Sequence, residues 1–216
     1  IIDEVHLLND DRGPVIEALV ARTLRLVETS QQMIRIVGLS ATLPNYADVA
    51  LFLKVNPSSG LFHFGAAYRP VPLTQTFLGV SKATKTGQGS GGVMEQKQLM
   101  LELAYAKALQ AIRRGKQVMV FVHARNDTIR TARGLLELAK KKAEEAEFKP
   151  NPDLHPRGQL MVREVMKSKS GEVRDFFNGG FGIHHAGMLR PDRGLSERLF
   201  AEGLINVLVC TATLAW

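Results

Sequence analysis

Two carboxylates near the start of the sequence have a type and spacing that can support phosphoryl transfer. Asp3 and Glu4 follow the apolar pair Ile1 and Ile2 in the segment IIDEVHLL. An aspartate at the end of a strand can hold Mg²⁺, and a neighbouring acid can orient an attacking water molecule. Acidic residues in this position also serve as helix caps, so the pair alone leaves both interpretations open.

Polar residues follow further segments that have the composition of buried strands. SAT ends one such segment at 40–42, HAR follows another at 123–125, and TAT follows the last at 211–213. Ligands of open parallel sheets bind at the carboxyl ends of the strands. Two units with polar strand ends facing each other therefore predict a cleft between two lobes.

The elements that must position these residues alternate between strand and helix patterns. Short β-rich runs predict strands, and apolar residues at helical spacing predict helices, one of which begins at Pro14. Asn45 and Asp48 resemble a capping box before a short helix. The expected strands are 1–2, 34–40, an edge strand at 74–80, a fully buried strand at 117–123, and strands at 181–185 and 205–213. Expected helices are 14–28, 46–53, 94–113, 126–147, 159–168, 172–177 and 190–203.

This alternation indicates an α/β fold with a parallel sheet covered by helices, in two parts. We expect the first part at 1–70 and the second at 93–216. Between them, 71–92 predicts an extended segment and a flexible connector, because it ends in GQGSGG at 87–92.

Composition narrows the class of protein. The 216 residues are 45% hydrophobic, which is ordinary for a chain that buries a core. No apolar run reaches the roughly 18–20 residues that span a bilayer, so we expect a soluble intracellular protein without a membrane partner. The single cysteine, Cys210, fits a reducing compartment and a buried position. A net charge of +7 favours a polyanionic partner such as nucleic acid, although KKK at 140–142 has the pattern of a solvated helix face.

The order and spacing of five motifs resemble those of one enzyme family. DEVH at 3–6 and SAT at 40–42 are similar to motifs II and III of superfamily 2 helicases of the DExH type. VFVHAR, GIHHAGM and VLVCTATLAW, which begin at 120, 182 and 207, are similar to motifs IV, IVa and V. Within the family the chain resembles the two-cassette class, most closely the cointegrator-complex type in its first cassette and next the spliceosomal type.

The resemblance implies a fold and a set of roles. Residues 1–70 would be the C-terminal part of a first RecA-like ATP-binding lobe, and 93–216 the N-terminal part of a second, both incomplete. Asp3 would hold Mg²⁺ through water, Glu4 would polarise the attacking water, and His6, Ser40 and Thr42 would couple hydrolysis to lobe closure. The residues implied to contact the nucleic-acid strand are His123, Arg125, His185, Gly187, Thr211 and Thr213.

The implied activity is ATP- and Mg²⁺-dependent 3′→5′ translocation on single-stranded nucleic acid, with duplex unwinding. Members of the family are linked to alkylated-DNA repair and to the disassembly of stalled ribosomes, as subunits of multiprotein complexes. The implied location is nucleus and cytoplasm. Nothing in the sequence selects DNA over RNA.

Two parts of the family pattern are not present. No G-x-x-x-x-G-K-[ST] phosphate loop occurs, and the family's arginine motif would lie beyond Trp216. We therefore expect a fragment from inside a longer reading frame that hydrolyses no ATP on its own. Two alternatives stay open: a helicase-like scaffold cassette without activity, and a basic β/α module that binds nucleic acid without ATP.

Overall fold

The computed structural model describes residues 1–80 and 91–215, without the side chains of 91–94 and 215. The chain forms two compact units, unit 1 from Ile1 to Thr76 and unit 2 from Phe77 to Trp216. The connector expected at 71–92 crosses the boundary between the units, and residues 81–90 of it lie outside the described part. No helix among the described residues is long and apolar enough to cross a membrane.

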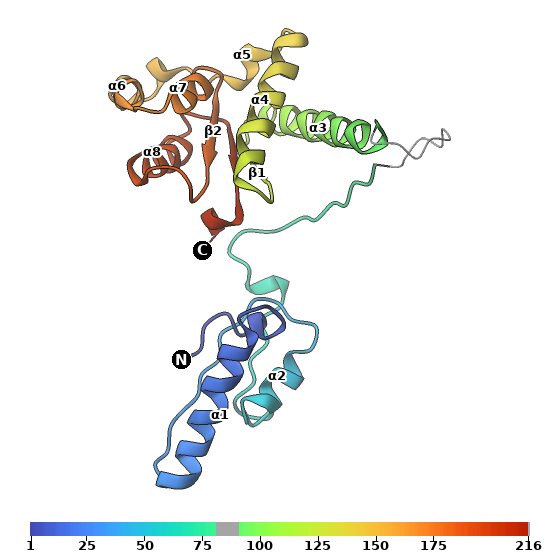
Figure 1. Ribbon diagram of the computed structural model, residues 1–216, viewed down its shortest axis with the longest axis vertical. Coiled ribbons are helices and arrows are strands. Elements are labelled where there is room, and N and C mark those ends of the chain that lie inside the picture. Colours follow the sequence, from blue (N-terminus) through green and yellow to red (C-terminus); the bar gives the residue numbers. More distant parts are fainter. Residues whose placement is uncertain (81–90, 216) are drawn as a thin grey trace. The chain divides into compact units, whose positions relative to one another are not determined.

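Unit 2 is built on a parallel sheet, which confirms the predicted α/β class. Its strands are β1 (Val118–Phe121), β2 (Phe181–His184) and β3 (Val207–Cys210), in the order β1-β3-β2. The central strand β3 pairs in parallel with both neighbours (Figure 1). Crossovers between parallel strands need a helix each, which accounts for the helical segments between the strands.

Helices cover both faces of this sheet, and each face has its own apolar core. Val207 and Val209 of β3 pack into a core with α3 and α4, whereas Leu208 packs with α6 and α8 on the other face. This alternation follows from the two-residue repeat of a strand. The helices of unit 2 are α3 (Gly91–Ile112), α4 (Arg125–Lys141), α5 (Glu145–Phe148), α6 (Gly158–Lys167), α7 (Gly171–Asn178) and α8 (Arg190–Ala201), with 3₁₀ turns at Pro152–Leu154 and Ala212–Ala215.

The strand expected at 117–123 forms, but the prediction that it is fully buried is wrong. Val118 and Val120 of β1 pack against the core on the side of α3 and α4. Met119 and Phe121 point to the other face and are 42% and 55% exposed. The reason is coverage of that face, because α8 packs mainly over β2 and β3.

Unit 1 is mainly helical and has a small core. Helix α1 begins at Gly13 with Pro14 in its first turn, as predicted, and the buried core joins Val5, Val20 and Leu53. The elements of unit 1 are a 3₁₀ helix η1 (Val5–Asn9), α1 (Gly13–Ser30), α2 (Tyr46–Phe52) and a 3₁₀ turn η2 (Ala66–Tyr68).

The strands predicted for unit 1 do not form as strands. Segments 1–2 and 34–40 meet only at one parallel bridge, between Ile2 and Gly38. Ile34 and Leu39 remain 39% and 49% exposed, and a lone strand pair without packing on its faces is marginal. The predicted edge strand at 74–80 does not form. This segment crosses from the end of unit 1 to the start of unit 2 as mostly exposed coil.

The helix predicted after SAT forms as α2, but the predicted capping box does not. Asn45 is the N-cap of α2 and makes no side-chain hydrogen bond there. Its backbone carbonyl instead accepts the N–H of Asp48 at 3.1 Å. The first turn of α2 is thus closed by the main chain.

Candidate functional site

The bridge between the two extended segments of unit 1 positions the acidic pair. Ile2 N–H donates to the carbonyl of Val37 at 2.8 Å, and Leu39 N–H donates back to Ile2 at 2.8 Å. Asp3 and Glu4 leave this bridge, and the N–H of Glu4 donates to Oδ1 of Asp3 at 2.9 Å. The exposed carboxylate of Asp3 suits a contact with Mg²⁺ through water, because this ion keeps several of its waters in protein sites.

The backbone of Glu4 is unusual. Its φ of 55° and ψ of 44° place it in the left-handed region, which costs about 1–2 kcal/mol for a residue with a Cβ. The turn sends the chain directly into η1 and leaves the Glu4 side chain half-buried beside His6. Strained backbone of this kind is concentrated at functional sites, where the surrounding contacts hold it.

His6 contacts a residue of each of the two motifs in unit 1, Glu4 of DEVH and Ala41 of SAT. Its Nδ1 lies 3.2 Å from Oε2 of Glu4 and 3.3 Å from the backbone nitrogen of Ala41. Ser40 donates its hydroxyl to the carbonyl of Ala41 at 2.9 Å, and exposed Thr42 follows. The structure thus brings together Asp3, Glu4, His6 and the SAT segment, which are separated by about 36 positions in the sequence.

These groups do not form a preassembled metal cage. The described residues contain no group of three or more His, Cys, Asp or Glu side chains that could hold a metal ion. A magnesium ion that is bound chiefly by nucleotide phosphates needs only one or two carboxylates from the protein. The single exposed carboxylate of Asp3 therefore fits this ion in the presence of a nucleotide.

In unit 2 the register of the sheet gathers the strand-end residues at one edge. Phe121 of β1 and His184 of β2 are both partners of Cys210 in β3, so the three strands end level with one another. His185 and Thr211 follow directly after β2 and β3, and His123 is the second residue after β1. They therefore lie at the same edge of the sheet, as predicted for ligand-binding residues.

Arg125 lies close to the turn after β2. A Cβ built on Gly187 would be 3.4 Å from Cδ of Arg125 and 3.1 Å from Nδ1 of His185, so the three residues are neighbours. The N–H of Gly187 donates to Nδ1 of His185 at 3.1 Å. Partial burial lowers the pKa of His185, the positive charge of Arg125 lowers it further, and Glu172 opposes both effects.

The two threonines after β3 form one hydroxyl pair. Thr211 is buried and donates its N–H to the carbonyl of His184 at 3.1 Å, which ties the end of β3 to the end of β2. Oγ1 of Thr211 and Oγ1 of Thr213 are 3.2 Å apart. The side chains of Thr213, after β3, and His123, after the edge strand β1, are both exposed and therefore open to a ligand.

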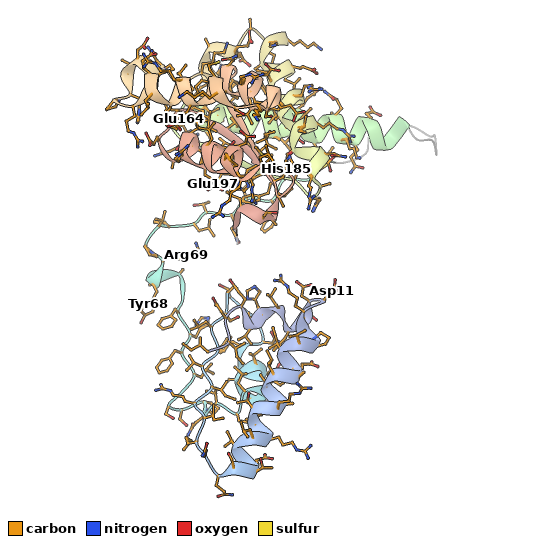
Figure 2. The ribbon with its side chains drawn as sticks, turned by 60° about the vertical axis from the view of Figure 1, so that its left-hand side comes forward. Asp11, Tyr68, Arg69, Glu164, His185 and Glu197 are labelled. Atoms are coloured by element: carbon orange, nitrogen blue, oxygen red, sulfur yellow. The ribbon has the colours of Figure 1, made fainter. Side chains whose placement is uncertain are left out.

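A cavity of about 560 Å³ adjoins this edge, and its basic residues were missed in the sequence. Arg190 and Arg193 line it together with His184, Glu197 and Thr213. Figure 2 labels Glu197 on α8 and His185 at the end of β2. The run RPDR at 190–193, directly after motif IVa, was the available signal, since it places two arginines three positions apart on one helix face.

Comparison with known proteins supports the motif assignment. No protein-family model matches the chain. Over all 216 residues it is 56% identical to the DExH-box ATP-dependent RNA helicase DExH14 of Arabidopsis thaliana, of which it covers 10%. It is 55% identical to the human activating signal cointegrator 1 complex subunit 3 and 50% identical to the RQC trigger complex helicase SLH1 of Saccharomyces cerevisiae, covering 9% and 10% of them.

The chain is thus homologous along its whole length to a segment of DExH-class helicases, and the resemblance found in the sequence is confirmed. The helicases that it matches include the cointegrator-complex type, at 54–56% identity in fish and mammals. The chain spans about a tenth of the length of these relatives.

Proposed function

We propose that this chain is the central part of an ATP-dependent helicase motor of the size of its relatives. Unit 1 contributes the end of the first RecA-like lobe, in which Asp3 holds Mg²⁺ through water and Glu4 polarises the water that attacks the γ-phosphate. His6, Ser40 and Thr42 connect this chemistry to the second lobe. ATP and Mg²⁺ supply the free energy for movement along the strand in the 3′→5′ direction.

One observation carries the proposal for unit 2. The strands β1, β2 and β3 end in register, so the predicted strand-contacting residues share one edge of the sheet. Such an edge, with His123, Arg125 and Thr213 exposed, suits contacts to sugar and phosphate. Backbone contacts fix position without reading sequence, as a translocating motor requires.

RNA is the substrate that we propose first. The name of the Arabidopsis relative describes an RNA helicase, and that of the yeast relative places it in an RQC trigger complex. Repair of alkylated DNA is the second candidate, which the resemblance to the cointegrator type suggests. The names of the relatives also support membership of a multiprotein complex, and we propose a location in both nucleus and cytoplasm.

The test is ATP turnover of the whole helicase with and without single-stranded RNA or DNA. We expect turnover that the strand stimulates, and a loss of at least about 100-fold in Glu4→Gln, because positioned acid–base groups contribute 10²–10⁴-fold. Glu17→Gln is the matched control, since Glu17 is exposed on α1 away from the motif residues.

The outcomes separate the alternatives. Equal turnover in wild type and Glu4→Gln would contradict the assigned role of Glu4. No turnover in either protein, together with retained strand binding, would favour a scaffold cassette without activity. The preferred strand in the stimulation assay assigns the substrate.

A further inference from the structure

His184 is a buried polar side chain to which the motif pattern gives no role. It ends β2 and is 3% exposed, and its Nε2 lies 2.7 Å from Oε1 of Glu197 on α8. A polar group that is taken out of water is unfavourable unless it is hydrogen-bonded. The bond to Glu197 therefore offsets the burial of this ring, and it joins β2 to the helix that follows it. Figure 2 labels Glu197 and His185, the residue after His184.

The second ring nitrogen of His184 indicates where the proton lies. Nδ1 is buried and has no hydrogen-bond partner among the described residues. A proton on Nδ1 would bury an N–H donor without an acceptor, which is unfavourable. The network thus places the proton on Nε2, and this N–H donates to the carboxylate of Glu197. What Glu197 must supply is an oxygen within reach of Nε2.

Glu197 makes this contact from a helix that is held by its own packing. Leu195 and Leu199 of α8 are buried in the core that also contains Leu208 of β3. The side chain of Glu197, in contrast, is 51% exposed. A change at Glu197 therefore alters the contact to His184 and leaves the packing of α8 in place.

The backbone of His184 joins two strand ends. Its carbonyl accepts the N–H of Thr211 at 3.1 Å, which ties the residue after β3 to the end of β2. The next residue, His185, accepts the N–H of Gly187 at its Nδ1 at 3.1 Å. A side chain that is locked by packing and by a hydrogen bond holds the backbone that carries it. The bond to Glu197 therefore acts on the part of the edge that carries Thr211, His185 and Gly187.

We propose that Glu197 is a positioning residue for binding of the nucleic-acid strand. It holds the imidazole of His184, and through this ring it keeps the end of β2 in the geometry that strand contacts at this edge require. Glu197 acts through His184 rather than on the strand itself. The inference rests on the proposed function, and it adds a residue that lies 13 positions beyond His184 and outside the five motifs.

The experiment measures the affinity of the whole helicase for a single-stranded uridine oligonucleotide, by fluorescence anisotropy, in two variants of Glu197. Glu197→Gln loses the charge but keeps an oxygen at the same reach, so Nε2–H of His184 retains an acceptor. Glu197→Asp keeps the charge but has a shorter side chain, so the acceptor is withdrawn from the ring. We expect Glu197→Gln to bind within about twofold of wild type. Glu197→Asp should bind roughly tenfold more weakly, which is the usual size of the contribution of one hydrogen bond.

Glu137→Asp is the matched control for the shorter side chain. Glu137 is exposed on α4 and has no partner in the described part of the chain, so this variant should bind as wild type does. An affinity of Glu197→Asp equal to that of Glu137→Asp would overturn the proposal. A Glu197→Gln variant as weak as Glu197→Asp would overturn it too, because the charge and not the bond to His184 would then carry the effect.

Failure of the inference can be told apart from failure of the proposed function. If wild type binds no strand, both fail. If wild type binds the strand, and Arg125→Gln weakens binding while Glu197→Asp does not, only the inference fails, because the edge then binds the strand without help from Glu197.

Discussion

The Nδ1 atom of His6 lies 3.2 Å from the Oε2 atom of Glu4. The same nitrogen is 3.3 Å from the backbone nitrogen of Ala41, whose N–H it can accept. One ring nitrogen holds either a proton or a lone pair, so it donates to Glu4 or accepts from Ala41, not both. The protonation of Nδ1 therefore decides whether His6 bonds to Glu4 in its own motif or to Ala41 in the SAT segment.

We predict that His6→Ala uncouples strand binding from hydrolysis. Loss of the shared nitrogen should reduce the stimulation of ATP turnover by single-stranded RNA about tenfold, since couplings between sites are usually 5–150-fold. Unstimulated turnover should change much less. The measurement is turnover of the whole helicase across RNA concentrations.

His63→Ala is the control for this prediction. His63 is exposed in unit 1, where its ring stacks on that of Tyr46 with the centroids 4.9 Å apart. Among the described residues its side chain makes no hydrogen bond or ion pair with either motif. Equal stimulation in His6→Ala and His63→Ala would show that the contacts of His6 carry no coupling.

A glycine fixes the start of β2. Gly180 has a φ of +82°, and a Cβ there would lie 1.9 Å from the carbonyl oxygen of Phe148. We predict that Gly180→Ala destabilises unit 2 by roughly 3 kcal/mol or more, because backbone strain and overpacking add. Gly203 also has a positive φ, of +72°, but open space around it, so Gly203→Ala should cost only about 1–2 kcal/mol. Urea unfolding of both variants measures the difference, and equal losses would contradict the steric argument.

The sequence was sufficient to predict the α/β fold of unit 2, because the helices that pack on its strands belong to the same chain. Strands β2 and β3 are buried on both faces, so their apolar runs and their polar ends were informative. Thr211 belongs to a polar set that follows such an apolar run, whereas the role expected for His185 came from the family resemblance. The β-rich composition of 34–40 predicted a strand that the structure does not form. This segment pairs with the rest of unit 1 at a single bridge, and Ile34 and Leu39 stay exposed.

Other features depend on contacts that spacing along the chain does not reveal. The bond from Ala41 to His6 joins residues 35 positions apart. Arg190 and Arg193 are three positions apart on one helix face, and the cavity beside them separates them from arginines with the same spacing on an ordinary helix surface. Asp192 also illustrates this, because it lies in the first turn of α8 and its carboxylate accepts a hydrogen bond from the hydroxyl of Ser168 at 2.7 Å in a buried position.

A surface ion pair gives unit 2 a pH dependence with a definite sign. Arg113 contacts Glu147 through two bonds of 2.6 Å, and hydrogen bonding to Arg113 lowers the pKa of this carboxyl below its usual value. The contribution is therefore present above the usual pKa of glutamate and is lost as the pH falls through the lower folded value. We predict that Glu147→Gln lowers the midpoint of thermal unfolding slightly at pH 7, and that the difference from wild type vanishes in acid.

The comparison for this pair uses Glu137→Gln, an exposed glutamate of α4 without a partner in the described residues. The Glu137→Gln variant should have the same midpoint of thermal unfolding as wild type at each pH. A difference between Glu147→Gln and wild type that persists unchanged below the folded pKa of Glu147 would contradict the assigned cause.

The single cysteine provides a direct measurement of unfolding in unit 2. Cys210 is buried at the end of β3, and burial raises the pKa of its thiol from 9.0 to about 11. Two pKa units lower the thiolate fraction about 100-fold at neutral pH, and the thiolate is the reactive form. We predict that a thiol reagent labels the folded chain at pH 8 at least about 100-fold more slowly than the urea-unfolded chain, which serves as the reference. Labelling of the folded chain at the unfolded rate would mean that the end of β3 is open to solvent, and the packing described for this edge would be wrong.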